Sequence, residues 1–477
     1  MRRSLAIIVL GSIFVSTAAA ATIRGTKHAD LLQAAFDGTT AVSCGAARDV
    51  VSADLADTVS SDCEVVSRRL SVDPYANRDS QHETAVEPDD FAYGDTVVAA
   101  FQLGRRGEGA AANIGTAVSN DDGRTWQRAV LTGVTVNAGG AETAASDPTV
   151  AYDAVHKVWL VGTLTIHPNG SRVLVARSGD GLHWSAPVDA ADGPILDKDW
   201  LACDNNTASP FRGRCYLEYT DDEKDVTVSQ SSDDGGQTWS QPVRAGSVLV
   251  GTQPVIQPSG ALTVVAGDFE GEDALTGSMV ALHSTDGGAT WQTFTVTSFR
   301  SADNAPMRAI ALPSLDVDSN GTIYAAWHDC RFRPSCTAND VVVSTSADGM
   351  RWATPIRATT GPSSFITGIA ADPALPGHLA LVYAYFHPGK EKALGIALRQ
   401  SGDGGHTWTA PQRLDTVPMQ MSWLPRSEGG RMVGDYFSVA YAGGRVVPVF
   451  ALAIAPTKTR LHEAIFATSL QALGERR

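Results

Sequence analysis

The chain has 477 residues, of which 43% are hydrophobic, so it is long enough to bury a large core and ordinary enough in composition to be globular. Its formal net charge of −15 argues against non-specific binding to nucleic acid or to an anionic membrane surface, because both are themselves negatively charged. We therefore expect no nucleic acid and no membrane among its partners, and we expect a monomer.

The first residues have the pattern of a secretory signal peptide. Arg2 and Arg3 give a positive start, an apolar run covers residues 5–15, and residues 18–21 are small enough for cleavage. The apolar run is too short to span a bilayer comfortably. We expect residues 1–21 to be removed and the mature protein to be secreted to the extracellular space.

Six cysteines in an exported chain predict disulfides. Fifteen connectivities are possible for six cysteines. We expect the local one, because each partner is then far closer in sequence than in any alternative. The predicted pairs are Cys44 with Cys63, Cys203 with Cys215, and Cys330 with Cys336.

Residues 22–66 differ from the rest of the chain. Residues 23–32 read Ile-Arg-Gly-Thr-Lys-His-Ala-Asp-Leu-Leu, which resembles a worn copy of the Gly/Asp nonapeptide of RTX-type β-rolls. Such rolls bind Ca²⁺ between stacked turns, so one degenerate copy rarely makes a site. We expect a short disulfide-closed segment and no cofactor or metal, with Ca²⁺ as the alternative.

A short motif recurs along the remaining chain. Residues 401–408 read Ser-Gly-Asp-Gly-Gly-His-Thr-Trp, and the pattern Ser-x-Asp-x-Gly-x-Thr-Trp returns at 119–126, 232–239 and 284–291. Versions one residue shorter occupy 178–184 and 346–352. A fixed period of this kind predicts a repeat architecture. The six closing tryptophans are Trp126, Trp184, Trp239, Trp291, Trp352 and Trp408.

The motif predicts a structured hairpin between two strands. Its Asp accepts hydrogen bonds from backbone N–H groups just downstream, its Gly supplies a positive φ, and its Trp buries a large ring. This pattern resembles the Asp-box, or BNR, repeat of sialidase-type β-propellers. The resemblance implies an all-β propeller in which each repeat is one four-stranded blade.

The clearest unit has strands at residues 149–152, 158–161 and 173–176, and a fourth strand beginning at Trp184. Six such units are expected. A seventh lacks the box and has strands at residues 435–439, 445–454 and 463–468. Residues 65–71 are expected to supply its missing strand, which would join the two ends of the chain. We predict a propeller over residues 67–477 with seven four-stranded blades, with six blades as the alternative.

Propeller geometry predicts where a site lies. The Asp-box turns lie on the face opposite the starts of the first strands, so the box residues are scaffold. A pocket is expected over the central axis, lined by first-strand starts and by loops between the second and third strands. Any one of these residues is more often an ordinary solvated charge, but together they favour a polar ligand. The selected residues are Glu87, Arg105, Asp147, Asp199, Gln253, Arg308, Asp329, Arg331, Asp435 and Tyr436.

The resemblance also implies roles. Sialidases bind the sugar carboxylate with three arginines and use a tyrosine nucleophile, assisted by a glutamate, with an aspartate as acid/base. By analogy, the arginines are Arg105, Arg308 and Arg331, the pair is Tyr436 with Glu87, and the acid/base is Asp147 or Asp199. Substrate contacts would be completed by Gln253, Asp329 and Asp435.

Two features depart from this pattern or qualify it. The Phe/Tyr-Arg-Ile-Pro motif expected near the first blade is missing, and its nearest echo is Met-Arg-Ala-Ile at residues 307–310. The Cys330–Cys336 loop would hold Arg331 rigidly toward a ligand. The alternative is that Arg331 pairs with Asp329.

Three functions fit these residues. The first is a glycoside hydrolase acting on an acidic glycan. The second is a polysaccharide lyase acting on a uronic acid, with Arg331 neutralising the carboxylate and Tyr436, His167 or His328 as base. The third is a non-catalytic propeller that binds glycan or protein. We predict the hydrolase, with a glycan or polysaccharide as its substrate.

Overall fold

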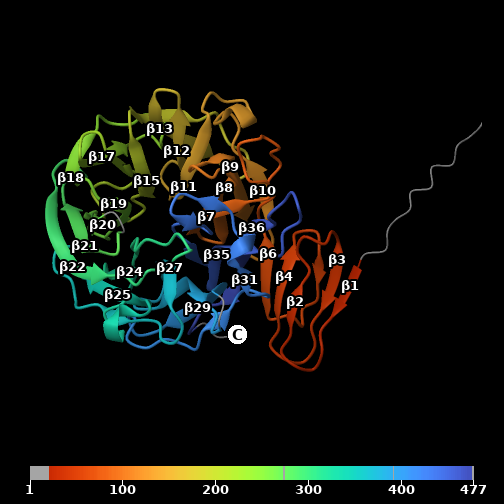
Figure 1. Ribbon diagram of the computed structural model, residues 1–477. Helices are drawn as coiled ribbons and strands as arrows, with labels where there is room; N and C mark the ends of the chain where they lie inside the picture. The colour runs from red at the N-terminus through yellow and green to blue at the C-terminus, as the bar shows by residue number, and fades with distance from the viewer. Residues whose placement is uncertain (1–20, 272–273, 390–391, 475–477) are drawn as a thin grey trace, which may run out of the picture.

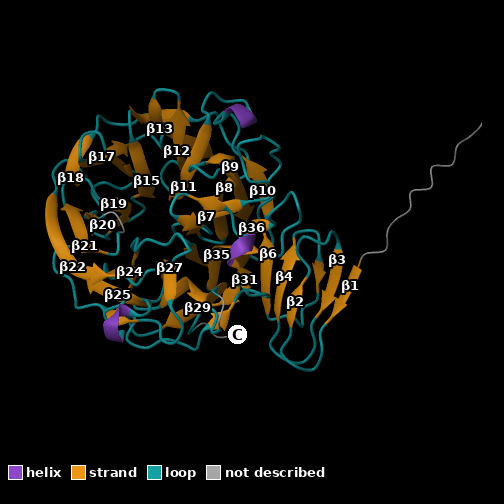
Figure 2. Cartoon of the chain, viewed as in Figure 1, coloured by secondary structure: helices purple, strands orange, loops and turns teal. Residues whose placement is uncertain are grey.

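The computed structural model describes residues 21–271, 274–389 and 392–474, and within them the regular structure consists of β-strands joined by loops and turns, apart from a few short helical turns (Figure 2). The described residues also contain three short 3₁₀ helices, η1 (Val136–Ala138), η2 (Pro334–Cys336) and η3 (Met421–Trp423). Among these residues, no helix has the length and apolar character that crossing a membrane requires. The predicted signal peptide lies outside the described residues, apart from its last position.

Six consecutive four-stranded antiparallel units follow the N-terminal segment, one for each Asp box. The first three contain β7 (Ala85–Tyr93), β8 (Thr96–Arg105), β9 (Ala111–Ser119) and β10 (Gln127–Val130); β11 (Ala144–Asp153), β12 (Val158–His167), β13 (Gly170–Ser178) and β14 (Val188–Gly193); and β15 (Leu196–Cys203), β16 (Cys215–Asp221), β17 (Val226–Ser232) and β18 (Val243–Ser247).

The next three contain β19 (Val250–Ile256), β20 (Leu262–Glu270), β21 (Thr276–Ser284) and β22 (Gln292–Arg300); β23 (Ser314–Val317), β24 (Ile323–Asp329), β25 (Asp340–Ser346) and β26 (Ile356–Arg357); and β27 (Ser364–Ala371), β28 (Leu379–Phe386), β29 (Ala393–Ser401) and β30 (Gln412–Arg413). A short strand, β31 (Met419–Gln420), also pairs with β29. All-β architecture is therefore confirmed.

A last unit joins the two ends of the chain. It contains β34 (Ser438–Ala442), β35 (Arg445–Ala453) and β36 (Glu463–Thr468), with β37 (Leu470–Gln471) beside β35. Its fourth strand is β6 (Val65–Arg69), which pairs antiparallel with β36 through Arg69 opposite Phe466 and Ser67 opposite Thr468. The predicted domain boundary after residue 66 falls inside β6.

The N-terminal strands pair in parallel, unlike the rest of the molecule. One column contains β1 (Ala21–Arg24), β3 (Thr40–Ser43) and β5 (Thr58–Val59), and the other contains β2 (Leu31–Gln33), β4 (Val50–Asp54) and β6. Aspartate side chains tie these turns together by accepting backbone N–H bonds, as Asp49 does from Asp30 at 2.7 Å and Asp57 from Thr40 at 2.7 Å. The likeness to RTX-type rolls stays a prediction.

The units are arranged around a centre, with the N-terminal parallel strands stacked on one side (Figure 1). The first strand of each unit contacts the first strand of the next, from β7 through β11, β15, β19, β23 and β27 to β34, and β34 contacts β7. Because these strands lie innermost, the residues at their starts meet around the axis.

The Asp boxes lie at the far end of the first strands. Ser401 of the last box pairs with Leu379 of β28, and Leu379 pairs with Ala371, the final residue of β27. The box aspartates are therefore remote from the strand starts, as predicted. Asp403 accepts the backbone N–H of Thr407 at 2.8 Å and its hydroxyl at 2.6 Å, and these bonds lower the pKa of Asp403 to about 2.

Two strand boundaries differ from the predictions. The fourth strand of the second unit begins at Val188 rather than at Trp184, because the indole of Trp184 leaves the sheet and donates to Thr116 Oγ1 of β9 at 3.1 Å. The last unit begins at Ser438 rather than at residue 435, because Asp435 is drawn to Lys198 and Arg308 instead of to a strand neighbour.

Replacing Asp403 with alanine is expected to lower the free energy of unfolding by about 1 kcal/mol, because the turn loses its main hydrogen-bond acceptor. Urea denaturation measures the change, with the exposed Asp189→Ala as the control. Loss of a function of the axial region without loss of stability would contradict a scaffold role.

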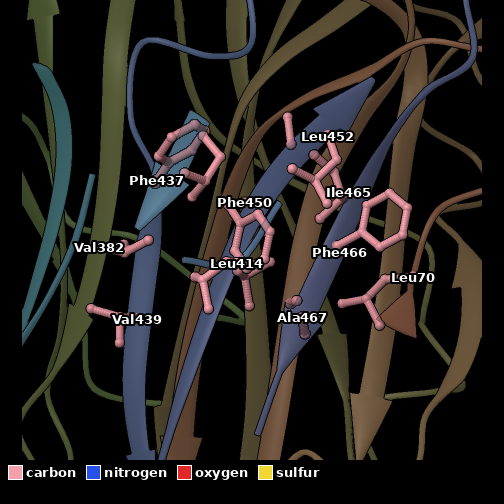
Figure 3. Packing of buried hydrophobic residues seen from close by; sticks show 14 of the residues in the cluster. Leu70, Val382, Leu414, Phe437, Val439, Phe450, Leu452, Ile465, Phe466 and Ala467 are labelled. Carbon is pink, nitrogen blue, oxygen red and sulfur yellow. The ribbon is translucent and has the colours of Figure 1, made fainter. Parts of the chain in front are cut away.

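The largest hydrophobic cluster lies where the ends of the chain meet (Figure 3). Leu70 of the N-terminal segment packs with Ile465 and Phe466 of β36 and with Phe450 and Leu452 of β35, all at most 5% exposed. Burying such side chains stabilises the fold by roughly 1.5–3 kcal/mol each. The joined termini are thus part of the core.

All three predicted disulfides are present. Cys44 is bonded to Cys63, Cys203 to Cys215, and Cys330 to Cys336. The local connectivity is therefore confirmed.

Candidate functional site

The site begins with a β-bulge that recurs at the start of the first strands. In five units the pairing of the first two strands is interrupted there, and the extra residue has a positive φ. A non-glycine residue in this conformation is strained, and such strain concentrates at functional sites. The bulged residues are Glu87 (φ 52°), Asp147 (φ 44°), Lys198 (φ 55°), Gly251 (φ 78°) and Ile366 (φ 48°).

Three of these residues, in consecutive units, are ionisable and buried. Glu87 is 1% exposed, Asp147 3% and Lys198 9%. Because they hold equivalent positions around the axis, their side chains come together. Lys198 Nζ lies 3.7 Å from Asp147 Oδ2 and 3.1 Å from Asp435 Oδ2.

Two arginines complete this group. The Arg308 guanidinium forms a bidentate pair with Asp435, in which Nε donates to Oδ1 at 2.8 Å and Nη2 donates to Oδ2 at 2.7 Å. Arg105 Nη1 donates to Gln102 Oε1 at 2.8 Å. We call the following residues the axial cluster: Glu87, Gln102, Arg105, Ser146, Asp147, Lys198, Arg308 and Asp435.

Neutral side chains connect the two carboxyls at the bulges. Gln102 Nε2 donates to Glu87 Oε2 and, at 3.1 Å, to Ser146 Oγ. Ser146 Oγ in turn donates to Asp147 Oδ1 at 2.9 Å. Glu87 and Asp147 are therefore the ends of one hydrogen-bonded chain.

The environment pushes the pKa values of these carboxyls apart. Burial, with the nearby Asp147 and Asp435 carboxylates, raises the pKa of Glu87 to about 8. Burial is the largest influence on Asp147 and acts to raise its pKa, but the Lys198 ammonium, the Ser146 hydrogen bond and the Arg105 guanidinium together outweigh it, so the pKa is lowered. The pKa of Asp435 is likewise lowered, because Lys198 and Arg308 overcome its burial. The surroundings thus favour the protonated form of Glu87 and the ionised form of Asp147.

A cavity of about 290 Å³ runs along the axis next to the cluster. Asp435 belongs to both, and Trp200 and Tyr436 form an aromatic part of the cavity wall, with ring centroids 5.1 Å apart. The Tyr436 hydroxyl donates to the Pro148 carbonyl at 3.3 Å. Burial and the surrounding carboxylates raise the pKa of Tyr436 well above its ordinary value, so it stays protonated.

A short hairpin lies against the arginines. Its strands are β32 (Arg426–Ser427) and β33 (Gly430–Arg431). Ser427 Oγ accepts from Arg105 Nη2 at 2.8 Å, and the Glu428 carbonyl accepts from Arg308 Nη1 at 3.1 Å. The hairpin therefore fixes the outer side of both guanidinium groups.

Six of the predicted site residues meet in this region: Glu87, Arg105, Asp147, Arg308, Asp435 and Tyr436. Asp199 does not join their hydrogen bonds in the described part of the chain. It is 1% exposed and its Oδ2 faces Gly162 of β12, since the bulge turns Lys198 rather than Asp199 toward Asp435.

Three other predicted residues make contacts within the protein. Arg331 binds Asp329 through Nε at 2.9 Å and Nη2 at 2.6 Å, so these two residues satisfy each other, as the alternative held. Gln253 lines the cavity, but its side chain braces neighbouring units by hydrogen bonding both backbone groups of Leu315.

Sequence reasoning missed Lys198 and Gln102. Lys198 lies between Asp197 and Asp199 in the sequence. This arrangement is compatible with a buried cation, but only Asp199 was selected from it. Gln102 lies within the strand predicted to follow Glu87 and carries no charge, so no sequence signal distinguishes it.

Fold and site together define a β-propeller protein with a buried polar centre on its axis. Residues 94–317 match the family described as BNR repeat-like domain. The resemblance to the Asp-box repeat is therefore confirmed over these residues. No curated protein matches the chain.

Several solved structures are similar to this chain at low identity. A protein of unknown function from Dyadobacter fermentans has a TM-score of 0.47 at 14% identity, covering 85% of this chain and 99% of the other. Phage phi92 endosialidase has 0.49 at 10%, covering 95% and 76%. Trypanosoma rangeli sialidase in complex with sialic acid has 0.44 at 11%, covering 85% and 58%. Likeness at this level says nothing of the chemistry of this chain.

Proposed function

We propose that the protein is an exported glycoside hydrolase that cleaves an acidic glycan at the axial cluster. The observation that carries the proposal is the separation of two carboxyl pKa values within one hydrogen-bonded chain, with Glu87 raised to about 8 and Asp147 lowered. Two titratable groups pushed apart in this way are suited to acid and base roles at neutral pH.

The chemistry follows from those protonation states. Glu87 gives its proton to the glycosidic oxygen as the bond from that oxygen to the anomeric carbon breaks. Asp147 takes a proton from the water that adds to the anomeric carbon. The net reaction adds one water across the bond, and proton exchange with solvent restores both carboxyls.

Three cations support an anionic substrate. Lys198, Arg308 and Arg105 face the same carboxyls. In the free protein, Arg105 donates to the Ser427 hydroxyl and Arg308 to the backbone carbonyl of Glu428. A substrate carboxylate would replace these two hairpin acceptors, because guanidinium groups pair well with carboxylates. Tyr436 and Trp200 would then pack against the sugar ring from the cavity side.

Hydrolysis is favoured over the lyase reaction by the position of the possible bases. His167 Nε2 lies 3.7 Å from Asp192 Oδ1, so this histidine is already paired with a carboxylate. His328 is buried, and burial lowers its pKa to about 3. Tyr436 holds its proton at a raised pKa, so neither a phenolate base nor a phenolate nucleophile is favoured. Asp147 is the better nucleophile or base.

Seven blades are part of the proposal. The contacts of seven first strands in cyclic order support this number, and the pairing of β6 with β36 supports closure through the chain ends. The three disulfides support export, because such bonds persist in oxidising compartments.

The test is mass spectrometry of a mixed sialylated and uronate-containing glycan pool after incubation with the purified mature protein. Products that have gained water support the proposal. Unsaturated products without added water would replace it with the lyase. Retention of glycan on the protein without turnover, in an assay that covers both glycan classes, would replace it with a binding propeller.

A further inference from the structure

The orientation of the Gln102 amide is fixed by its partner. Arg105 has only N–H donors, so the atom that faces its Nη1 at 2.8 Å must be the amide oxygen, Oε1. The amide nitrogen therefore faces Glu87 and Ser146. Gln102 is 0% exposed, so water does not compete for these bonds.

This orientation sets the direction of every bond in the chain. Because Gln102 Nε2 donates to Glu87 Oε2, that oxygen accepts. The carbonyl oxygen of a protonated carboxyl is the better acceptor, so this bond favours Oε1 as the place of a proton carried by Glu87. Because Nε2 also donates to Ser146 Oγ, the hydroxyl hydrogen of Ser146 is free to point at Asp147 Oδ1, 2.9 Å away. That oxygen is therefore an acceptor too.

We propose that Gln102 and Ser146 are positioning residues, which hold the transferable proton on Oε1 of Glu87 and hold Asp147 in its acceptor form. The inference rests on the proposed hydrolysis for its catalytic meaning, but the hydrogen-bond directions stand without it. Neither residue titrates, so both transmit orientation and take up no proton themselves.

The groups that face Glu87 come from several strands. They are Asp147 and Asp435, which carry negative charge, Arg105, Lys198 and Arg308, which carry positive charge, and the phenol of Tyr436. None of these charges is removed by changing Gln102, so an altered titration of Glu87 in such a variant reports the lost hydrogen bond.

The principal test compares Gln102→Leu with the wild type. Without the amide donor, the ionised form of Glu87 loses a hydrogen bond, so its pKa should rise and the alkaline limb of kcat should move to higher pH. We expect kcat to fall roughly 10- to 100-fold with little change in KM, a part of the roughly 10²- to 10⁴-fold that general acid catalysis contributes, because Glu87 still carries the proton but is less well oriented. Ser146→Ala should lower kcat, and Ser146→Thr, which keeps the hydroxyl, should restore it.

Gln257→Leu is the matched control, because Gln257 is also a buried amide but donates to the backbone carbonyls of Gly321 and Ala347 rather than to a carboxyl group. It should leave the pH profile unchanged. An unchanged profile in Gln102→Leu as well would overturn the inference.

A second measurement does not depend on turnover. Infrared difference spectra of a pH titration should show a protonated-carboxyl band that Glu87→Gln removes and Gln102→Leu shifts in frequency and midpoint. If the wild type cleaves no glycan but this shift is found, the proposed hydrolysis fails while the proton placement holds. A band that Gln102→Leu leaves in place would sink the inference even in an active enzyme.

Discussion

Glu87→Gln is expected to lower kcat/KM on a cleaved glycan by about 10²- to 10⁴-fold, the usual contribution of a general acid. Glutamine preserves the shape of the side chain, and its amide oxygen can still accept the hydrogen bond from Gln102. It has no acidic proton to transfer. Steady-state kinetics on the products identified by mass spectrometry measure the loss. Glu218→Gln is the matched control, because burial raises the pKa of Glu218 to about 8 as well, while among the described residues its side chain accepts a hydrogen bond from Ser229 alone.

The pH profile of the wild type follows from the same two groups. Glu87 must be protonated, so the rate should fall as pH rises through about 8. Asp147 must be ionised, and its lowered pKa keeps it so at mildly acidic pH, where the rate should persist. A profile that lacks the alkaline limb in the wild type, or keeps it in Glu87→Gln, would assign the acid to another residue.

Lys198→Met is expected to lower the free energy of unfolding by about 3 kcal/mol or more, because removing one partner leaves buried carboxylates uncompensated. Asp147 and Asp435 would lose the ammonium they share, and only Arg308 would remain beside Asp435. Urea denaturation at neutral pH measures the effect.

The control is Lys224→Met. Lys224 also pairs with an aspartate, Asp221, at 2.6 Å, but its side chain is 68% exposed. Surface pairs of this kind contribute about 0–1 kcal/mol. Equal losses in the two variants would show that Lys198 has no special role in the cluster.

The Lys198 effect should depend on pH in a defined direction. Its pKa is raised in the folded protein, chiefly by Asp147 and Asp197 against the opposing effect of burial. Its stabilisation is therefore complete below the ordinary lysine pKa and is lost as pH rises through the raised value. Asp435 has the opposite pH dependence. Because its pKa is lowered in the folded protein, its contribution to stability is lost as pH falls through that lowered pKa.

Much of the fold was predictable from sequence because the Asp box is a local structure. The hydrogen bonds of Asp403 to Thr407 join residues four apart, so the turn can be read from spacing alone. The period of the tryptophans then implied repeated units, and the short separations of the cysteines implied their pairing.

The site was predictable only as a region, because a bulge reverses which side chains face the axis. One extra residue in a strand moves its neighbours to the opposite face. Nothing in Asp197-Lys198-Asp199 reveals that the lysine takes the positive φ, so Asp199 was selected in its place. The guanidinium of Arg331, which was expected to face a ligand, is instead hydrogen bonded to Asp329, two residues earlier in the chain.

The strand β6 has a consequence for how the chain is made. It is synthesised long before its partner Phe466, so this pairing has to wait until the propeller units between them have been made. Meanwhile β4 already covers its other edge in parallel, from Val50 beside Val65 to Asp54 beside Arg69. The strands made first thus cover one edge of β6 that would otherwise invite aggregation before folding is complete, and they hold β6 in place as the template on which the last unit forms.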